Sequence, residues 1–174
     1  MLLPDPTPPL ILTLTLDAAS QAFFDELRQR HFPPRRNFLS AHLTLFHALP
    51  GAEYAALAAR LAADAAAQPA PLPLAVSGLK YTGQGVSYAF DSAELRALHR
   101  GWQQQWQPWL SAQDQQGLRP NVTVQNKVTP AVARALHETL LADFQPFEAQ
   151  GTGLALWAYR GGPWERRAVF PFRG

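Results

Sequence analysis

Two short segments of this chain place polar side chains at the alternate positions of a strand. Residues 42–45 read HLTL and residues 121–124 read NVTV. Successive side chains of an extended strand point to opposite faces, so His42 shares a face with Thr44, and Asn121 shares one with Thr123. Imidazole exchanges protons near neutral pH, and a hydroxyl donates and accepts hydrogen bonds. Each segment therefore predicts one strand face suited to chemistry and one apolar face that packs.

Length and composition limit the kind of protein that carries these segments. The chain has 174 residues, of which 47% are hydrophobic and 16% charged, and it contains no cysteine. This favours one folded unit with a real core and excludes disulfides, zinc–thiolate sites and thiol nucleophiles. No apolar run approaches the roughly 20 residues that span a membrane. The formal charge of +2 and the sequence pI near 9.3 permit an anionic partner that is recognised locally.

The first residues carry no sign of export. Residues 1–6 read MLLPDP and lack a basic segment, and the apolar stretch at 10–16 alternates leucine or isoleucine with threonine as a strand does. The sequence thus predicts no export signal, and we expect a cytoplasmic protein. The absence of cysteine favours this location only weakly.

The rest of the chain supplies the elements that must hold the two segments. The first half predicts a strand at 10–16, a helix capped by Asp17, the strand with residues 42–45, an alanine-rich helix near 52–67 and a strand at 72–79. The second half predicts a strand at 86–90, a helix starting at Ser92, the strand from residue 121 to 128, a helix capped by Thr129, and strands at 151–159 and 166–172.

The two halves match closely enough to indicate an internal duplication. His42 lies 32 residues after the start of the first strand, and Asn121 lies 35 residues after Val86. We therefore expect a single bilobal α+β domain over residues 1–174, with lobe one at about 1–85 and lobe two at about 86–174. Each lobe would read strand, helix, strand, helix, strand. A pseudo-two-fold axis would bring the two polar strand faces together in a central cleft, with helices on the outer faces.

Three longer segments resemble a known superfamily. They are SAHLTLFHALP at 40–50, RPNVTVQNKV at 119–128 and YRGGPWE at 159–165. They are similar to the two-histidine phosphoesterase superfamily, in particular its bacterial 2′-5′ RNA ligase-like and RNA cyclic phosphodiesterase branch, whose members carry His-x-Thr/Ser-apolar twice. The resemblance implies a bilobal α+β fold whose motifs flank a phosphodiester, with no metal or other cofactor. The implied partner is an RNA terminus or a small cyclic or 2′-5′-linked nucleotide.

The resemblance assigns His42, Thr44 and Thr123 directly to the family pattern. Opening a 2′,3′-cyclic phosphate needs a base for the attacking water and an acid for the departing ribose oxygen, and the two threonine hydroxyls would hold the phosphate oxygens. Asn121 stands where the second histidine is expected, and an amide cannot transfer a proton at physiological pH. Three explanations stay open: a pseudoenzyme that binds ligand, slow or altered turnover with His42 alone, or an asparagine introduced to trap substrate.

Further residues are candidates for substrate binding. Gln125 and Lys127 continue the cleft-facing register of the second motif strand, although a lysine at a strand end is often simply solvated. Arg35, Arg36 and Arg119 precede the motif strands, where arginine suits phosphate but also serves solubility. Tyr159 and Trp164 flank a glycine-rich turn and could stack on a base, with a hairpin aromatic pair as the alternative.

The remaining histidines are expected to have non-catalytic roles. His47 is out of phase with His42 by the period of two, so it should face the helices in a packed or hydrogen-bonded role. His31, His99 and His137 fall in predicted helices, which favours structural or surface roles. The sequence thus predicts a monomeric phosphoesterase for an RNA or nucleotide 2′,3′-cyclic phosphate or 2′-5′ phosphodiester, with a non-catalytic RNA-end or nucleotide binding module as the alternative.

Overall fold

A computed structural model describes residues 7–173, so the segment at 1–6, on which the expected lack of an export signal partly depends, lies outside the described residues. The strands are β1 (Leu10–Leu16), β2 (Leu43–Leu49), β3 (Leu72–Tyr81), β4 (Val86–Asp91), β5 (Asn121–Gln125), β6 (Phe147–Ala158) and β7 (Glu165–Pro171). The helices are α1 (Ala18–His31), α2 (Tyr54–Ala67), α3 (Ala93–Trp106) and α4 (Pro130–Asp143), with short 3₁₀ turns at 34–36, 51–53 and 107–109.

Three helices begin at the cap residues that the sequence predicts. Side-chain oxygens accept hydrogen bonds from backbone N–H groups three residues later, in the pairs Asp17 with Ser20, Ser92 with Leu95, and Thr129 with Val132. Each bond satisfies one of the donors that a helix start leaves without an intrahelical partner. Over residues 7–173, no helix is long and apolar enough to cross a membrane.

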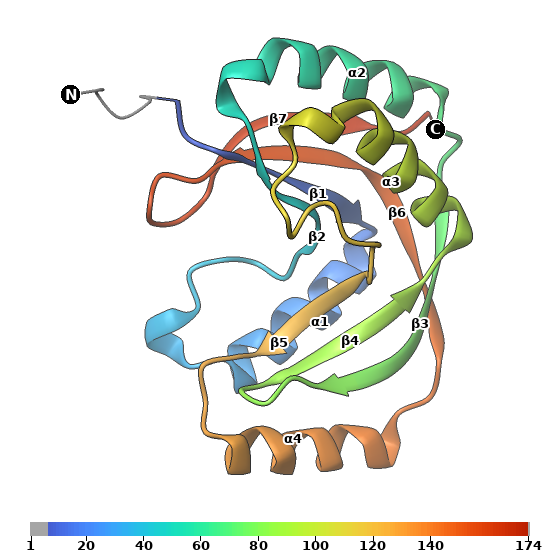
Figure 1. Ribbon diagram of the computed structural model, residues 1–174. Helices are drawn as coiled ribbons and strands as arrows, with labels where there is room; N and C mark the ends of the chain where they lie inside the picture. The colour runs from blue at the N-terminus through green and yellow to red at the C-terminus, as the bar shows by residue number, and fades with distance from the viewer. Residues whose placement is uncertain (1–6, 174) are drawn as a thin grey trace, which may run out of the picture.

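The strands form one antiparallel sheet in which the two motif strands lie at the two ends of the strand order. The order is β2-β1-β6-β3-β4-β5. β7 lies off this path and pairs with the second part of β6, beyond the part that pairs with β3. The long strand β6 therefore joins the two ends of the sheet, since its first part pairs with β3 and its second part with β1 and β7. The sheet curves until its edge strands β2 and β5 come into contact (Figure 1). The predicted α+β class is confirmed.

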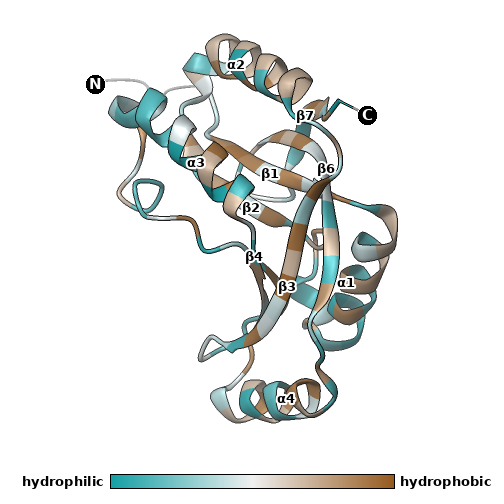
Figure 2. Ribbon diagram, turned by 90° about the vertical axis from the view of Figure 1, so that its right-hand side faces the viewer, coloured by the Kyte–Doolittle hydropathy of each residue, from teal (hydrophilic) through white to brown (hydrophobic). Residues whose placement is uncertain are grey.

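Helices and strands from the two halves of the chain interleave in space. α1 follows β1 in the chain but packs against β5, and its Phe24 contacts the rings of Tyr88 and Phe90 on β4. α3 belongs to the second half but lies beside α2, where Trp102 Nε1–H donates to Asp64 at 2.8 Å (Figure 2). Each half of the chain, divided at about residue 85, thus contributes a helix that packs on the other half. This arrangement is consistent with the expected pseudo-two-fold duplication.

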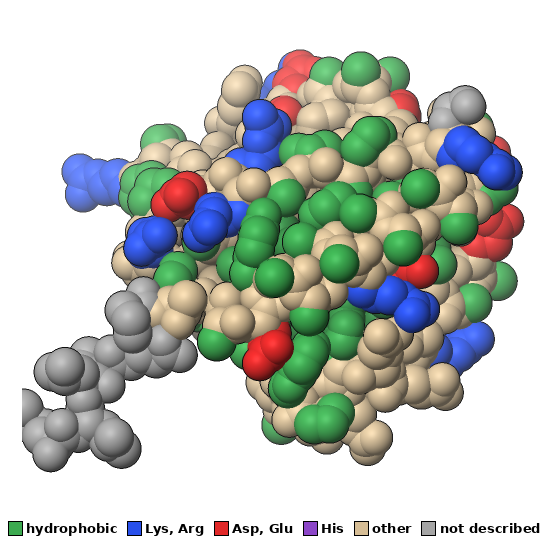
Figure 3. Space-filling model, turned by 90° about the horizontal axis from the view of Figure 1, so that it is seen from above, with side chains coloured by type: hydrophobic (Ala, Val, Ile, Leu, Met, Phe, Trp, Pro, Cys, Tyr) green, Lys and Arg blue, Asp and Glu red, His purple; other side chains and the backbone are tan. Residues whose placement is uncertain are grey.

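Large aromatic side chains from α1 and α3 form part of the core. Phe24, Trp102 and Trp106 are almost fully buried, whereas Phe23 and Trp109 are 41% and 37% exposed. Phe23 packs edge-to-face on the rim of the cluster around Phe24, and Trp109 belongs to a 3₁₀ turn beyond the end of α3, where the helical period no longer applies. The face above α2 and α3 carries apolar, basic and acidic side chains interspersed (Figure 3).

Candidate active site

The two motif strands line one cleft, which we call the central cleft. Its volume is about 330 Å³, within the range of small-molecule sites. The central cleft brings together six of the residues expected from the sequence: His42, Thr44, Arg119, Asn121, Thr123 and Trp164. Its lining also includes three ionisable residues that the sequence did not assign to it: His47, His99 and Asp114.

His42 lies one residue before β2 and is held by the backbone. Its Nδ1 lies 2.8 Å from the carbonyl oxygen of Ser40, and because a carbonyl only accepts, Nδ1–H must donate. The neutral ring therefore carries its lone pair on Nε2, the nitrogen that can take a proton. The ring of Trp164 lies against the imidazole at a centroid distance of 4.6 Å. This anchoring fixes both the ring position and the tautomer.

The surroundings of His42 favour its neutral form. Burial is the main cause that lowers its pKa below the ordinary histidine value, and the positive charges of Arg28 and His47 lower it further, while the hydrogen bond to Ser40 acts in the opposite direction. A histidine with a lowered pKa is unprotonated at neutral pH. His42 can therefore act as a base without first losing a proton.

Asn121 opens β5 in a matching position. Its Nδ2–H donates to the carbonyl oxygen of Arg119 at 3.0 Å, again two residues earlier in the chain. An amide held in this way offers hydrogen bonds to a ligand in the central cleft but no proton transfer. Of the two polar strand faces, only the one with His42 carries an acid–base group at the motif position.

Thr123 is tied to its neighbours on both sides. Its hydroxyl lies 3.0 Å from that of Ser87 on β4, and its carbonyl oxygen accepts from Arg28 Nη1 at 2.9 Å. Arg28 is 4% exposed and also donates from Nε to Asn37, in the loop that leads to His42. This guanidinium thus links the two motifs. The sequence contained a signal for it, since Arg28 falls four residues after Phe24 on the buried side of α1.

His47 faces the central cleft, and the prediction that it faces the helices is wrong. The pairing of β1 with β2 shifts register between the pair Leu12 and Phe46 and the pair Thr13 and Thr44. The shift leaves Leu45 as an extra residue, so Leu45 and Phe46 are both buried. A bulge of this kind moves the side chains that follow it to the opposite face. In β2 this holds as far as the second register shift, which falls between Phe46 and Leu49. His47 therefore returns to the face of His42 and Thr44.

A bulge in β5 likewise turns Gln125 away from the central cleft. The register shifts between the pair Val86 and Gln125 and the pair Ser87 and Thr123, which leaves Val124 as an extra residue. Gln125 is 4% exposed and lies outside the residues that line the cleft, contrary to the predicted register. Lys127, Arg36 and Tyr159 are exposed and also lie outside this lining. Lys127 adopts a left-handed backbone conformation beyond the end of β5, with φ of 65°.

A second hollow of about 400 Å³ adjoins the central cleft and shares His42 and Trp164 with it. Because its walls include Phe38, Trp157 and Trp164, we call it the aromatic pocket. Arg166 also lines it. Aromatic walls of this kind suit a flat ring such as a nucleobase. Across residues 7–173, no group of three or more His, Asp or Glu side chains could hold a metal ion.

Comparison with known proteins agrees with this geometry. Residues 16–163 match the 2′-5′ RNA ligase superfamily, which covers most of the chain and includes both motifs. The chain belongs to this superfamily. No curated protein matches the chain.

Solved structures of low sequence identity share the fold of this superfamily member. TT0787 of Thermus thermophilus is 17% identical, with a TM-score of 0.67 over 95% of this chain and 98% of its own. E. coli LigT complexed with 3′-AMP is 20% identical, with a TM-score of 0.62 over 97% and 99%. E. coli LigT complexed with phosphate is 16% identical, with a TM-score of 0.60 over the same shares.

Proposed function

We propose that this superfamily member is a phosphoesterase that acts on an RNA or nucleotide 2′,3′-cyclic phosphate or 2′-5′ phosphodiester. The observation that carries the proposal is the anchored His42, whose Nδ1–H is engaged by Ser40 while Nε2 stays available for proton transfer. Thr44 and Thr123 line the same cleft from opposite edges of the sheet. One base between two hydroxyl donors suits a phosphate that gains charge during displacement.

The residues of the cleft have two roles in the proposed reaction, which are proton transfer and binding of the phosphate oxygens. For a cyclic phosphate, His42 Nε2 takes a proton from water as the water oxygen bonds to phosphorus. One ribose P–O bond breaks, and the departing ribose oxygen must receive a proton. The hydroxyls of Thr44 and Thr123 and the guanidinium of Arg119 would hold the non-bridging oxygens, since charged and hydroxyl donors form strong hydrogen bonds to phosphate.

The comparisons support a nucleotide ligand. LigT has been solved with 3′-AMP and with phosphate, and its fold matches this chain over nearly its full length. In the present protein, phosphate would sit in the central cleft, and the attached nucleoside would extend into the aromatic pocket past Trp164. The expectations of a monomer and of a cytoplasmic location stay predictions.

Asn121 favours a second candidate function, which is binding of an RNA end or nucleotide without turnover. General acid–base help from one positioned group contributes about 10²–10⁴ in rate, so a cleft that lacks one proton-transfer group could hold its ligand and convert it very slowly. Binding alone would still stabilise the fold, by an amount that grows with ligand concentration.

The test is single-turnover conversion of a short RNA that ends in a 2′,3′-cyclic phosphate, together with the shift in melting temperature that 3′-AMP produces. Conversion that is lost in His42→Ala supports the phosphoesterase. A melting shift without conversion supports the binding module. Neither conversion nor a melting shift, with the protein folded, would rule out both functions.

A further inference from the structure

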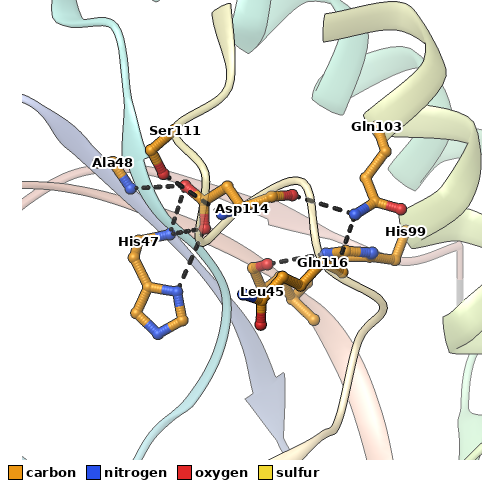
Figure 4. Close-up of polar contacts among 8 residues, drawn as sticks. All are labelled: Leu45, His47, Ala48, His99, Gln103, Ser111, Asp114 and Gln116. Carbon is orange, nitrogen blue, oxygen red and sulfur yellow. Dashed lines mark hydrogen bonds and ion pairs between the residues drawn. The ribbon is translucent and has the colours of Figure 1, made fainter. Parts of the chain in front are cut away.

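His47 and Asp114 form an oriented pair inside the central cleft (Figure 4). The His47 side chain is 50% exposed, whereas that of Asp114 is only 1% exposed. His47 Nδ1 lies 3.2 Å from Asp114 Oδ1. A carboxylate can only accept, so Nδ1–H donates and the neutral ring carries its lone pair on Nε2. This is the same tautomer that Ser40 imposes on His42.

The carboxylate of Asp114 is held in place from several sides. It accepts the backbone N–H of His47 at 2.8 and 3.0 Å and that of Ala48 at 2.9 Å. These bonds outweigh burial, which alone would raise the pKa of Asp114, so its pKa is lowered and it stays ionised. Gln103 Nε2 on α3 donates to the carbonyls of Asp114 and Gln116, which fastens the loop around the carboxylate (Figure 4).

We propose that His47 is the second proton-transfer group of the central cleft and that Asp114 is its positioning residue. His47 would thus supply the proton transfer that the amide of Asn121 cannot. The inference rests on the proposed phosphoesterase function. It differs from the family pattern stated above, in which both imidazoles come from the two motif positions. Here both would come from the first motif strand, because the bulge at Leu45 returns His47 to the face of His42.

The two histidines then take different parts. His42, neutral for the reasons given, removes a proton from the attacking water through Nε2. Protonated His47, held in orientation by the bond from its Nδ1–H to Asp114, gives its Nε2 proton to the departing ribose oxygen as the P–O bond breaks. His42 afterwards releases its proton to solvent and His47 takes one up, so the protein returns to its starting state.

His99 does not compete for this part, although it borders the central cleft. It is 2% exposed, its ring stacks on Phe46 at a centroid distance of 4.5 Å, and its Nε2–H donates to the carbonyl of Leu45 at 3.0 Å. The ionisable groups that face the cleft beside His47 are therefore His42, Asp114, His99 and Arg119. Among these groups, only His42 shares with His47 a neutral ring whose Nε2 carries no proton.

The experiment compares single-turnover rates on the cyclic-phosphate RNA for the protein as given, His47→Asn, and the double variant His47→Asn with Asn121→His. Asparagine at 47 keeps the backbone N–H bonds to Asp114, so melting temperature should hold. We expect His47→Asn to lose about 10²–10⁴ in rate. The double variant should recover most of it, because an imidazole at 121 can take over. His137→Asn, on α4 outside the cleft, is the matched control and should keep the full rate.

Each outcome decides a different point. An unchanged rate in His47→Asn overturns the inference and leaves the proposed function intact. The single variant Asn121→His completes the set. If it converts substrate while the protein as given is silent, the inference is overturned, and the protein as given is the binding module and not the phosphoesterase. Silence of every variant, with folding verified, removes the proposed function and the inference with it.

Asp114 has its own readout. In Asp114→Asn the carboxylate that accepts from His47 Nδ1–H is replaced by an amide. The neutral His47 ring should then lose its preference for the tautomer with the lone pair on Nε2, which two-dimensional ¹H–¹⁵N NMR of the ring reports, and the single-turnover rate should fall with it. A purely structural role for Asp114 would lower stability and leave the His47 tautomer unchanged, which would overturn its assignment as the positioning residue.

Discussion

His42 and Asn121 are anchored by equivalent hydrogen bonds. Each side chain donates to the carbonyl oxygen two residues before it, at 2.8 Å from His42 Nδ1 to Ser40 and at 3.0 Å from Asn121 Nδ2 to Arg119. The amide thus reproduces the anchored side of an imidazole but offers no counterpart of Nε2. The second motif keeps the local geometry of the first while lacking the atom that would move a proton.

This relationship predicts how a histidine would sit at position 121. In Asn121→His, Nδ1–H should donate to Arg119, so the neutral ring should show the tautomer with its lone pair on Nε2. Two-dimensional ¹H–¹⁵N NMR of the histidine rings reports this tautomer directly. Asn121 is exposed, so we expect the free energy of unfolding to change by less than about 0.5 kcal/mol.

Asn121→Ala is the control for the anchor itself. It removes the bond to Arg119 without adding a ring and should fold equally well. A spectrum in which the new histidine protonates Nε2 instead would contradict the inferred equivalence of the two positions.

The sequence predicts the elements well because their signals are local. The cap at Asp17, the alternation at 10–16 and the restart at Val86 each depend on neighbours within a few residues, and the structure confirms them. The resemblance to the superfamily likewise depends on three short segments, at 40–50, 119–128 and 159–165, and the family match over residues 16–163 confirms it.

What the sequence does not predict depends on register and on distant contacts. Strict alternation puts His47 among the helices and Gln125 in the cleft, and both predictions fail because each motif strand carries a bulge immediately after its threonine. The adjacent apolar pair Leu45 and Phe46 is a visible break in the alternation and could have revealed the first bulge. The contact of Asp114 with His47 spans 67 residues, and no local pattern indicates it.

Arg28 should support both the fold and the pKa of His42. In Arg28→Gln, the carbonyl of Thr123 loses a charged donor in a buried setting, which we expect to cost about 1.5–3 kcal/mol in urea unfolding. Loss of its positive charge should also raise the pKa of His42, as measured by NMR titration of the ring. Arg30→Gln, on the exposed side of α1, should change neither quantity. Equal effects in the two variants would show that Arg28 is not a specific link.

Asp114 should make stability sensitive to acid. Its pKa is lower in the folded protein than in the unfolded chain, because the bonds from His47 and Ala48 outweigh the opposing effect of burial. Its contribution is therefore complete above the unfolded value of about 3.9 and is lost as pH falls through the folded value. Urea unfolding from pH 7 down to pH 2.5 should show a shallower decline in Asp114→Asn, which should also be less stable at pH 7 by about 1–3 kcal/mol.

The exposed acid Asp143 on α4 provides the comparison for this measurement. Asp143→Asn should leave the free energy of unfolding at pH 7 within about 0.5 kcal/mol of the unchanged protein. If Asp114→Asn follows the same curve as the unchanged protein at every pH, the buried carboxylate contributes no acid-linked stability.

Trp164 should govern nucleotide affinity, because it forms a wall of both the central cleft and the aromatic pocket and lies against His42. Stacking of one base on an aromatic ring is worth about 1–3 kcal/mol, so Trp164→Ala should weaken 3′-AMP binding by about 5- to 150-fold in calorimetric titration. Trp164→Phe keeps an aromatic face and should retain most of the affinity. Tyr159 is 44% exposed and outside both hollows, so Tyr159→Ala should bind as the unchanged protein does. If Tyr159→Ala loses affinity while Trp164→Ala does not, the base lies on the outer face of the β6–β7 hairpin, and the aromatic pocket is not its site.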